Sequence, residues 1–192
     1  NKFKNKNQLE LLVAGCGTGK QVLLESITNL TAKITAFDLS ATSVAYAVRK
    51  TEDAAIEDIE FYVGDILEVD KLDKIYDRIF CSGVLHHMED PMAGWKSLVD
   101  VLKPGGYMLV SLYSDIARSA AKLGIDFVKE NNLKATPEDM RKLRDIVHNL
   151  PADDPMRELL FSADFHNMSM LCDYLFHVQE QRYTLPKIKE CL

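Results

Sequence analysis

The chain has 192 residues, of which 47% are hydrophobic and 27% charged, and its 23 Lys and Arg are outnumbered by 29 Asp and Glu. This length suits one domain, and the near-average hydrophobic content argues against a disordered or collagen-like chain. No apolar run approaches the roughly 18 residues of a membrane span, so no membrane partner is expected. The net charge of −6 weighs against a dedicated nucleic-acid binder, so no nucleic-acid partner is expected either.

The four cysteines are widely spaced and form no C-x-x-C motif: Cys16, Cys81, Cys172 and Cys191. This pattern predicts reduced thiols and a cytoplasmic location. The first residue is Asn1 and not Met. We therefore expect the chain to be a fragment of a longer protein, with further domains of that protein among its partners.

Five short apolar runs predict β-strands in the first part of the chain, at residues 9–14, 33–39, 59–63, 75–82 and 107–113. Between them, Ser40 is a candidate N-cap of one helix, and Asp90-Pro91 starts another that Lys103-Pro104-Gly105-Gly106 ends. Strands that alternate with helices predict βαβ units. The expected fold class is therefore α/β, with a doubly wound and mainly parallel sheet.

From Ser114 onward the sequence predicts helices. Thr136-Pro137-Glu138 is a good helix start, and residues 168–176 and 185–192 have a helical pattern. No repeat or clear linker separates the two parts. We therefore expect one domain, with residues 1–113 as its α/β core and residues 114–192 as a helical addition.

Three glycines in five residues follow the first predicted strand, in Gly15-Cys16-Gly17-Thr18-Gly19. Glycine tolerates φ > 0 and lets a ligand approach the backbone, although a plain tight turn would also use it. A phosphate-binding P-loop fails here, because Ala14 and Gln21 stand where it needs glycine and a hydroxyl. A dinucleotide fingerprint needs a glycine where Lys20 stands. An NAD-dependent oxidoreductase remains a second alternative function.

The G-x-G-x-G loop resembles instead the first motif of class I S-adenosylmethionine-dependent methyltransferases. Later landmarks of that family follow in order: Asp38, Asp65, Ser82-Gly83 and Lys103-Pro104-Gly105-Gly106. The resemblance covers residues 9–113. It implies a Rossmann-like methyltransferase fold with strand order 3-2-1-4-5, in which residues 1–113 bind the cofactor and residues 114–192 cover the acceptor site.

The resemblance also implies which residues hold S-adenosylmethionine, whose product is S-adenosylhomocysteine. They are Gly15, Cys16, Gly17, Thr18, Gly19, Asp38, Leu39, Asp65, Ile66, Ser82, Gly83 and Val84. Asp38 is expected to accept hydrogen bonds from both ribose hydroxyls, since a carboxylate can accept from two donors. Asp65 and Ile66 are expected to hold the adenine, and residues 82–84 to flank the donor methyl group.

One residue departs from the family pattern. The family commonly has Asp or Glu two residues before the first glycine, and here that residue is Val13. This departure keeps open an alternative in which the chain is a non-catalytic S-adenosylmethionine-binding module of a larger protein.

The methyl acceptor is expected to be a small molecule. The segment after the fourth strand lacks the Asn/Asp-Pro-Pro-Tyr run of amino-methylating enzymes on adenine or glutamine and the Pro-Cys of cytosine C5 enzymes. His87 is the one residue there that matches the metal-binding stretch of certain O-methyltransferases, so no metal is expected. A neutral imidazole suits proton abstraction near pH 7, which makes His87 the candidate catalytic residue.

The family fold usually has seven strands, and only five are visible here. Residues 175–180 and 182–186 are similar to proteins described as methyltransferase type 12, some of which are joined to tetratricopeptide repeats. Because two of the usual seven strands are not visible, we expect an incomplete sheet with its fifth strand at an open edge.

Overall fold

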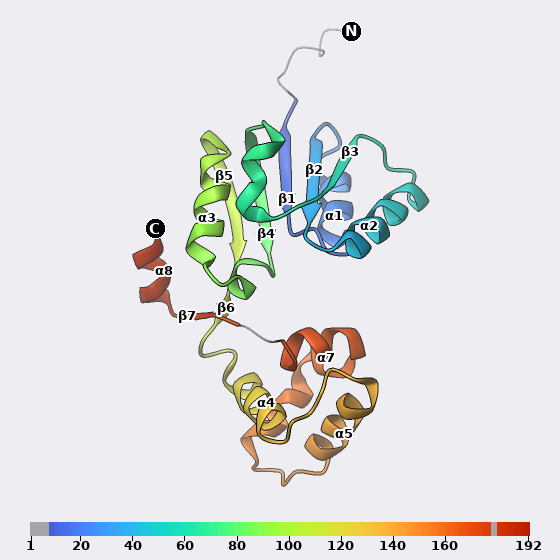
Figure 1. The fold of residues 1–192 in the computed structure, drawn as a ribbon, viewed down its shortest axis with the longest axis vertical. Helices are drawn as coiled ribbons and strands as arrows, with labels where there is room; N and C mark the ends of the chain where they lie inside the picture. The colour runs from blue at the N-terminus through green and yellow to red at the C-terminus, as the bar shows by residue number, and fades with distance from the viewer. Residues whose placement is uncertain (1–7, 178–179) are drawn as a thin grey trace. The chain divides into compact units, whose positions relative to one another are not determined.

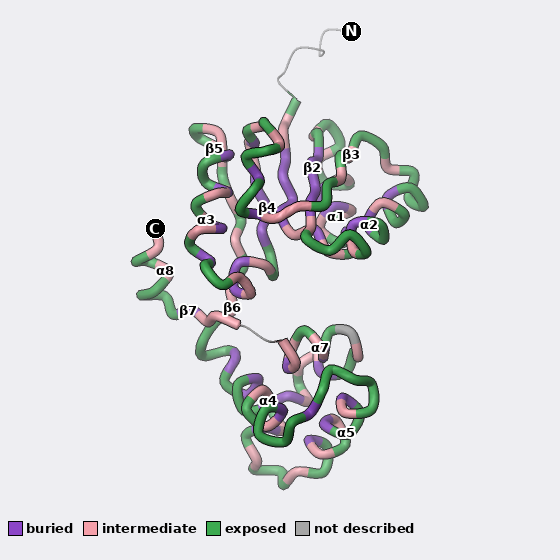
Figure 2. The backbone as a smooth tube through the Cα atoms, in the orientation of Figure 1, coloured by how far each residue is buried: buried purple, intermediate pink, exposed green. Residues whose placement is uncertain are grey.

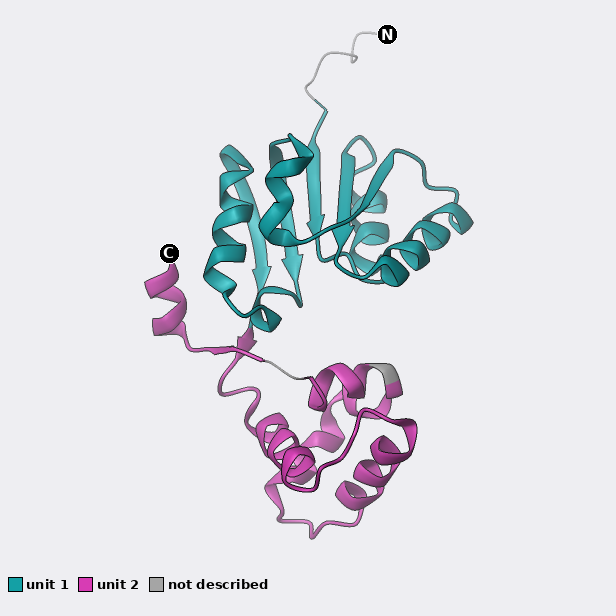
Figure 3. Ribbon diagram, viewed as in Figure 1, with its two compact units in different colours: residues 1–112 teal, residues 113–192 magenta. Residues whose placement is uncertain are grey.

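The computed structural model describes residues 8–177 and 180–192 (Figure 1). The chain divides into two compact units, residues 1–112 and residues 113–192 (Figure 3). The division falls one residue before the expected start of the helical addition. No helix in the described part of the chain is long and apolar enough to cross a membrane.

The first unit contains a five-stranded parallel sheet in the order β3-β2-β1-β4-β5. The strands are β1 (Glu10–Ala14), β2 (Lys33–Asp38), β3 (Ile59–Val63), β4 (Tyr76–Ser82) and β5 (Leu102–Ser111). This arrangement confirms the predicted α/β fold and its strand order 3-2-1-4-5.

Both faces of the central strand are buried, as a parallel sheet covered by helices requires. Leu11 and Val13 belong to one apolar cluster together with Val22 and Val44 of two helices. Leu12 and Ala14 belong to another cluster that includes residues of the opposite helical layer. Figure 2 shows the buried residues running along the central strands. Val13 is only 2% exposed, so packing in the core accounts for a valine at the position where Asp or Glu is common.

The connections are α1 (Lys20–Thr28), α2 (Ala41–Asp53) and α3 (Pro91–Asp100), with 3-10 helices η1 (Ile66–Leu72) and η2 (Leu85–His87). Local hydrogen bonds explain where two of them start. The Ser40 hydroxyl accepts from the Ser43 amide at the start of α2, as predicted for an N-cap. The Asp90 carboxylate accepts from the amides of Met92 and Ala93, and Pro91 occupies the first turn of α3.

The prediction for the fifth strand was wrong at both ends. β5 begins at Leu102, which the sequence assigned to the preceding helix, and it ends at Ser111. The pairing with β4 jumps from Tyr76–Leu102 to Arg78–Tyr107, so residues 103–106 bulge out of the ladder. The Lys103 ammonium lies 2.8 Å from the Asp77 carboxylate. This ion pair joins the proline- and glycine-containing segment to β4.

β5 pairs only with β4 and is an edge of the main sheet, which confirms the expected open edge for the described residues. Two further strands, β6 (Tyr113–Ser114) and β7 (Arg182–Tyr183), pair with each other in a separate two-stranded sheet. They were not predicted. They have two residues each, too few for an alternating pattern to reveal.

The second unit is mainly helical, as predicted. Its elements are α4 (Ser119–Glu130), α5 (Pro137–His148), η3 (Pro155–Phe161), α6 (Ala163–His166), α7 (Met168–Leu175) and α8 (Leu185–Cys191). Thr136 caps α5 by accepting from the Asp139 amide. A core of its own includes Leu143, Leu159 and Phe165, all fully buried.

Ala55 ends α2 in a left-handed conformation with φ of 54°, whereas the preceding Ala54 has φ of −88°. A side chain in the left-handed region costs roughly 1–2 kcal/mol, and glycine usually occupies this place. We expect Ala55→Gly to raise the free energy of unfolding by about 0.5–1 kcal/mol. The matched control Ala54→Gly should lower it by a similar amount, because glycine adds entropy to the unfolded chain. Urea denaturation of both variants measures the difference, and equal effects would contradict the strain at Ala55.

Candidate functional site

The predicted cofactor residues lie where four neighbouring strands end. The loop of residues 15–19 follows β1, and residues 65–66 lie shortly after β3. Asp38 ends β2 and Ser82 ends β4, and the predicted residues 39 and 83–84 follow directly. The register aligns these ends: Ala14 pairs with Phe37 and with Cys81. Because carboxyl ends of parallel strands meet at one edge, the structure brings the four predicted segments together there.

Asp38 holds the glycine loop in place. Its Oδ2 accepts from the Gly17 amide at 2.8 Å, and its Oδ1 accepts from the Ser40 amide at 2.9 Å. The amides of Gly15 and Cys16 both donate to the Phe37 carbonyl at 2.9 Å. Each carboxylate oxygen can accept more than one hydrogen bond, so Asp38 retains capacity for hydroxyl donors of a ligand.

Two glycines of the loop are required by packing. A Cβ at Gly15, where φ is +71°, would lie 2.1 Å from Cγ2 of Val84. A Cβ at Gly19, where φ is +85°, would lie 2.9 Å from Cβ of Ala47. These glycines allow the loop to approach α2 and the end of β4.

Other glycines at the same edge face open space. Nothing lies within 4 Å of a Cβ built on Gly17, Gly64 or Gly83. Gly17 and Gly83 have positive φ, whereas Gly64 does not. Neither backbone strain nor a neighbouring side chain therefore explains Gly64, which sequence reasoning missed. Gly64 borders open space beside the end of β3.

Exposed apolar side chains flank this open space. Leu39 follows Asp38 and is 75% exposed, and Val63, which pairs with Asp38 in the sheet, is 57% exposed. Leu67 is also exposed. Val63 and Leu67 were not among the predicted residues, and the only sequence signal was their place beside Asp65. Apolar surface at a strand end suits the flat face of an aromatic ring.

Asp65 and Ile66 have structural roles of their own. The Asp65 carboxylate accepts from the Leu67 amide at 3.0 Å and caps η1. Ile66 is only 5% exposed and packs in the cluster that includes Ile79 and Leu85. Core packing accounts for Ile66, and its contact with adenine stays a prediction, as does that of Asp65.

The two cysteines in this unit are protected from ionisation. Burial, together with the Asp38 carboxylate, raises the pKa of Cys16 to about 11. Burial raises the pKa of Cys81 to about 12. Both thiols therefore stay protonated near neutral pH, which argues against a thiolate nucleophile at either place.

The two histidines after β4 occupy different environments. His86 is buried, whereas His87 is half-buried, and their rings meet edge to face with centroids 4.3 Å apart. Of the predicted residues here, Ser82 and Gly83 are exposed and Val84 packs toward the glycine loop. Within the described ranges, no three His, Cys, Asp or Glu side chains are grouped to hold a metal ion.

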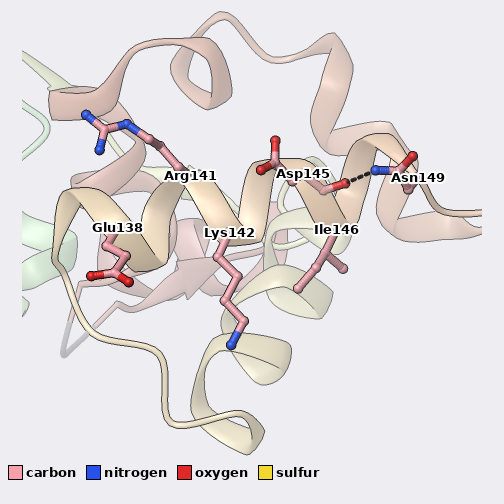
Figure 4. Close-up of a pocket in the computed structure, with 6 residues that line it drawn as sticks. All are labelled: Glu138, Arg141, Lys142, Asp145, Ile146 and Asn149. Atoms are coloured by element: carbon pink, nitrogen blue, oxygen red, sulfur yellow. Dashed lines mark hydrogen bonds between the residues drawn. The ribbon is translucent and has the colours of Figure 1, made fainter.

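A second surface feature lies on α5, along its outer face. This shallow depression of about 520 Å³ is lined by Glu138, Arg141, Lys142, Asp145, Ile146 and Asn149. Figure 4 shows these side chains projecting from one helix. Charges of both signs at helical spacing are typical of a solvated helix face, so we assign it no chemistry.

Comparison with protein families decides the class of protein. Residues 5–177 match the family of methyltransferase domains. The chain belongs to this family. The predicted resemblance to class I S-adenosylmethionine-dependent methyltransferases is thereby confirmed, and methyl transfer is favoured over the oxidoreductase alternative. The individual cofactor contacts stay predictions.

Named relatives agree with this assignment. An uncharacterized protein of Synechococcus sp. is 30% identical over 186 residues, which cover 93% of this chain and 45% of that protein. The mitochondrial ubiquinone biosynthesis O-methyltransferase of Schizosaccharomyces pombe is 31% identical over 115 residues, covering 59% of this chain and 40% of that protein. The chain thus spans less than half the length of these two curated relatives.

A solved structure shares the fold. PKMT2 from Rickettsia typhi in complex with AdoHcy superposes with a TM-score of 0.78 at 20% identity. The match covers 96% of this chain and 38% of that chain. At this identity the likeness concerns the fold alone.

The two kinds of glycine predict different mutational effects. Gly15→Ala adds an overlap with Val84 to the cost of a positive φ, so it should lower the free energy of unfolding by about 3 kcal/mol. Gly17→Ala meets no neighbour and should cost only about 1 kcal/mol. Thermal or urea unfolding measures both. Equal losses would contradict the distinction between a packing glycine and an open one.

Proposed function

We propose that this methyltransferase domain transfers a methyl group from S-adenosylmethionine to a small-molecule acceptor. The observation that carries the proposal is the Asp38 carboxylate, which ends β2 and accepts from the Gly17 amide while Gly17 itself faces open space. An anionic acceptor beside an uncovered glycine backbone is what a ribose with two hydroxyl groups requires.

The residues at the strand ends fit the rest of the cofactor. Asp38 would bind the ribose, and the exposed Leu39 would lie against the adenine together with Ile66. Asp65 would accept from the adenine amino group. The exposed Ser82 and Gly83, with Val84, would flank the methionine end.

When bound, S-adenosylmethionine supplies a methyl group on a positively charged sulfonium, which is an already activated leaving group. The task of the protein is therefore to align the acceptor and to exclude water. A base is needed only where the acceptor atom carries a proton. The half-buried His87 is our candidate for that base, because a neutral imidazole accepts protons near pH 7.

The small-molecule acceptor is supported by relatives of this chain. Besides the fission yeast enzyme, a ubiquinone biosynthesis O-methyltransferase of Pectobacterium atrosepticum is 26% identical over 171 residues. A tRNA U34 carboxymethyltransferase of Sulfurovum sp. has the same identity over the same length. The acidic composition favours the small molecule over a nucleic acid. The four free cysteines support a reducing, cytoplasmic location. The role of residues 114–192 as a cover of the acceptor stays a prediction.

Calorimetry tests the cofactor. S-Adenosylhomocysteine should bind, and Asp38→Ala should weaken it about 100-fold or more, since charge-assisted hydrogen bonds contribute roughly 1.5–3 kcal/mol each. Asp38 also holds the loop through the Gly17 amide. The near-isosteric variant Asp38→Asn therefore separates loss of the charge from loss of the side chain. Asp70→Ala, at an exposed position of η1, is the control and should bind normally. NAD binding in place of S-adenosylhomocysteine would overturn the proposal.

Turnover tests catalysis. Labelled S-adenosylmethionine incubated with small-molecule fractions of a lysate should yield a labelled product. With that acceptor, His87→Ala should lower kcat about 100-fold and leave S-adenosylhomocysteine affinity unchanged. His148→Ala, at an exposed position of α5, is the control. An unchanged kcat and pH profile would exclude His87 as the base. Binding without turnover on any fraction would favour the non-catalytic alternative.

A further inference from the structure

We infer that the second unit contains a binding site for a small oxyanion, namely a carboxylate or phosphate group. The site is a cavity of about 90 Å³ between one face of α4 and the side chains of His177, Glu180 and Arg182. It lies entirely within residues 113–192, and the inference does not rest on the proposed methyl transfer.

One wall of the cavity is a stripe of α4 formed by Lys122, Ile125, Asp126 and Lys129. These positions follow the i, i+3, i+4, i+7 spacing of a single helix face. Lys122 and Asp126 have the spacing of a helical ion pair, yet in the described part of the chain neither lysine pairs with a carboxylate. Two ammonium groups thus border the cavity without an anionic partner among those residues.

The opposite wall consists of His177, Glu180 and Arg182. The Glu180 carboxylate is buried, and its negative charge is already paired with the Arg118 guanidinium. Arg118 donates to it from Nε at 3.2 Å and from Nη2 at closer range, and both side chains are 8% exposed. The same Nη2 donates to the Tyr174 carbonyl at 3.0 Å. The Glu180 carboxylate is thereby committed to Arg118 and does not neutralise the lysines.

Arg182 adds a third cation. Its Nε lies 3.6 Å from Oδ1 of Asp115, so the two side chains form an ion pair that is too long for a hydrogen bond. No described residue accepts a hydrogen bond from its guanidinium. Asp115 thus partly balances Arg182, and Lys122 and Lys129 border the cavity together with Asp126, the one lining carboxylate that no cation pairs within the described residues. This local excess of positive charge runs against the net charge of −6 of the whole chain.

Size limits the ligand. A volume of 90 Å³ corresponds to about three water molecules at roughly 30 Å³ each. That space accommodates a carboxylate or phosphate group but no nucleotide. A guanidinium binds the paired oxygens of such groups through parallel hydrogen bonds. The ligand is thus a free anion of this kind or the anionic end of a larger molecule.

The test is an NMR titration of the whole chain at constant ionic strength. Inorganic phosphate, acetate and glycerol 3-phosphate are the probes, and the amides of Lys122, Lys129 and Arg182 are followed. Saturable shifts at these residues are expected. Lys129→Gln should weaken binding at least fivefold, whereas Lys134→Gln, at an exposed lysine outside the cavity, should leave it unchanged.

The outcomes separate the sources of the anion. Tighter binding of glycerol 3-phosphate than of inorganic phosphate assigns the site to the end of a larger ligand, and equal binding assigns it to the free ion. Shifts that rise linearly without saturation would overturn the inference. Equal affinities of Lys129→Gln and Lys134→Gln would overturn it as well, because the lysines would then act only as solvated charges.

Discussion

The candidate site depends on one carboxylate. Asp38 accepts from the Gly17 amide with one oxygen and from the Ser40 amide with the other, so it joins the loop after β1 to the start of α2. Its own position follows from β2, which pairs with β1 and β3 in the middle of the sheet. The same charge contributes to the raised pKa of Cys16. The loop geometry and the local electrostatics therefore have a common origin.

The glycines around this carboxylate have different physical causes. Gly15 and Gly19 admit Val84 and Ala47, whereas Gly17 and Gly64 face open space. A motif read from sequence treats these positions alike, because it records only the residue type. Only the neighbours of a built Cβ distinguish a glycine that packing requires from one that leaves room for a ligand. That distinction shows open space beside Gly17 and Gly64, at the edge where the predicted cofactor residues lie.

The sheet order and most element positions were predictable, because strands and caps are encoded locally by apolar runs and by residues such as Ser40 and Asp90. The start of β5 was not, because the bulge of residues 103–106 belongs to the pairing with β4, which is not local in the sequence. The different burial of His86 and His87 was also unpredictable. Neighbouring residues of one type look alike in sequence and differ only through the fold around them.

The second unit shows the same limit most clearly. Arg118 and Glu180 are 62 positions apart, and the local helix and turn patterns around each of them say nothing of their pairing. The Arg118 guanidinium also lies over the rings of Tyr113 and Tyr174, at 4.1 and 4.6 Å from their centroids. Desolvation offsets much of the attraction in a buried pair, so its main consequence is positional. It holds the chain beside β7, where the pairing of Tyr113 with Arg182 brings the third cation to the cavity.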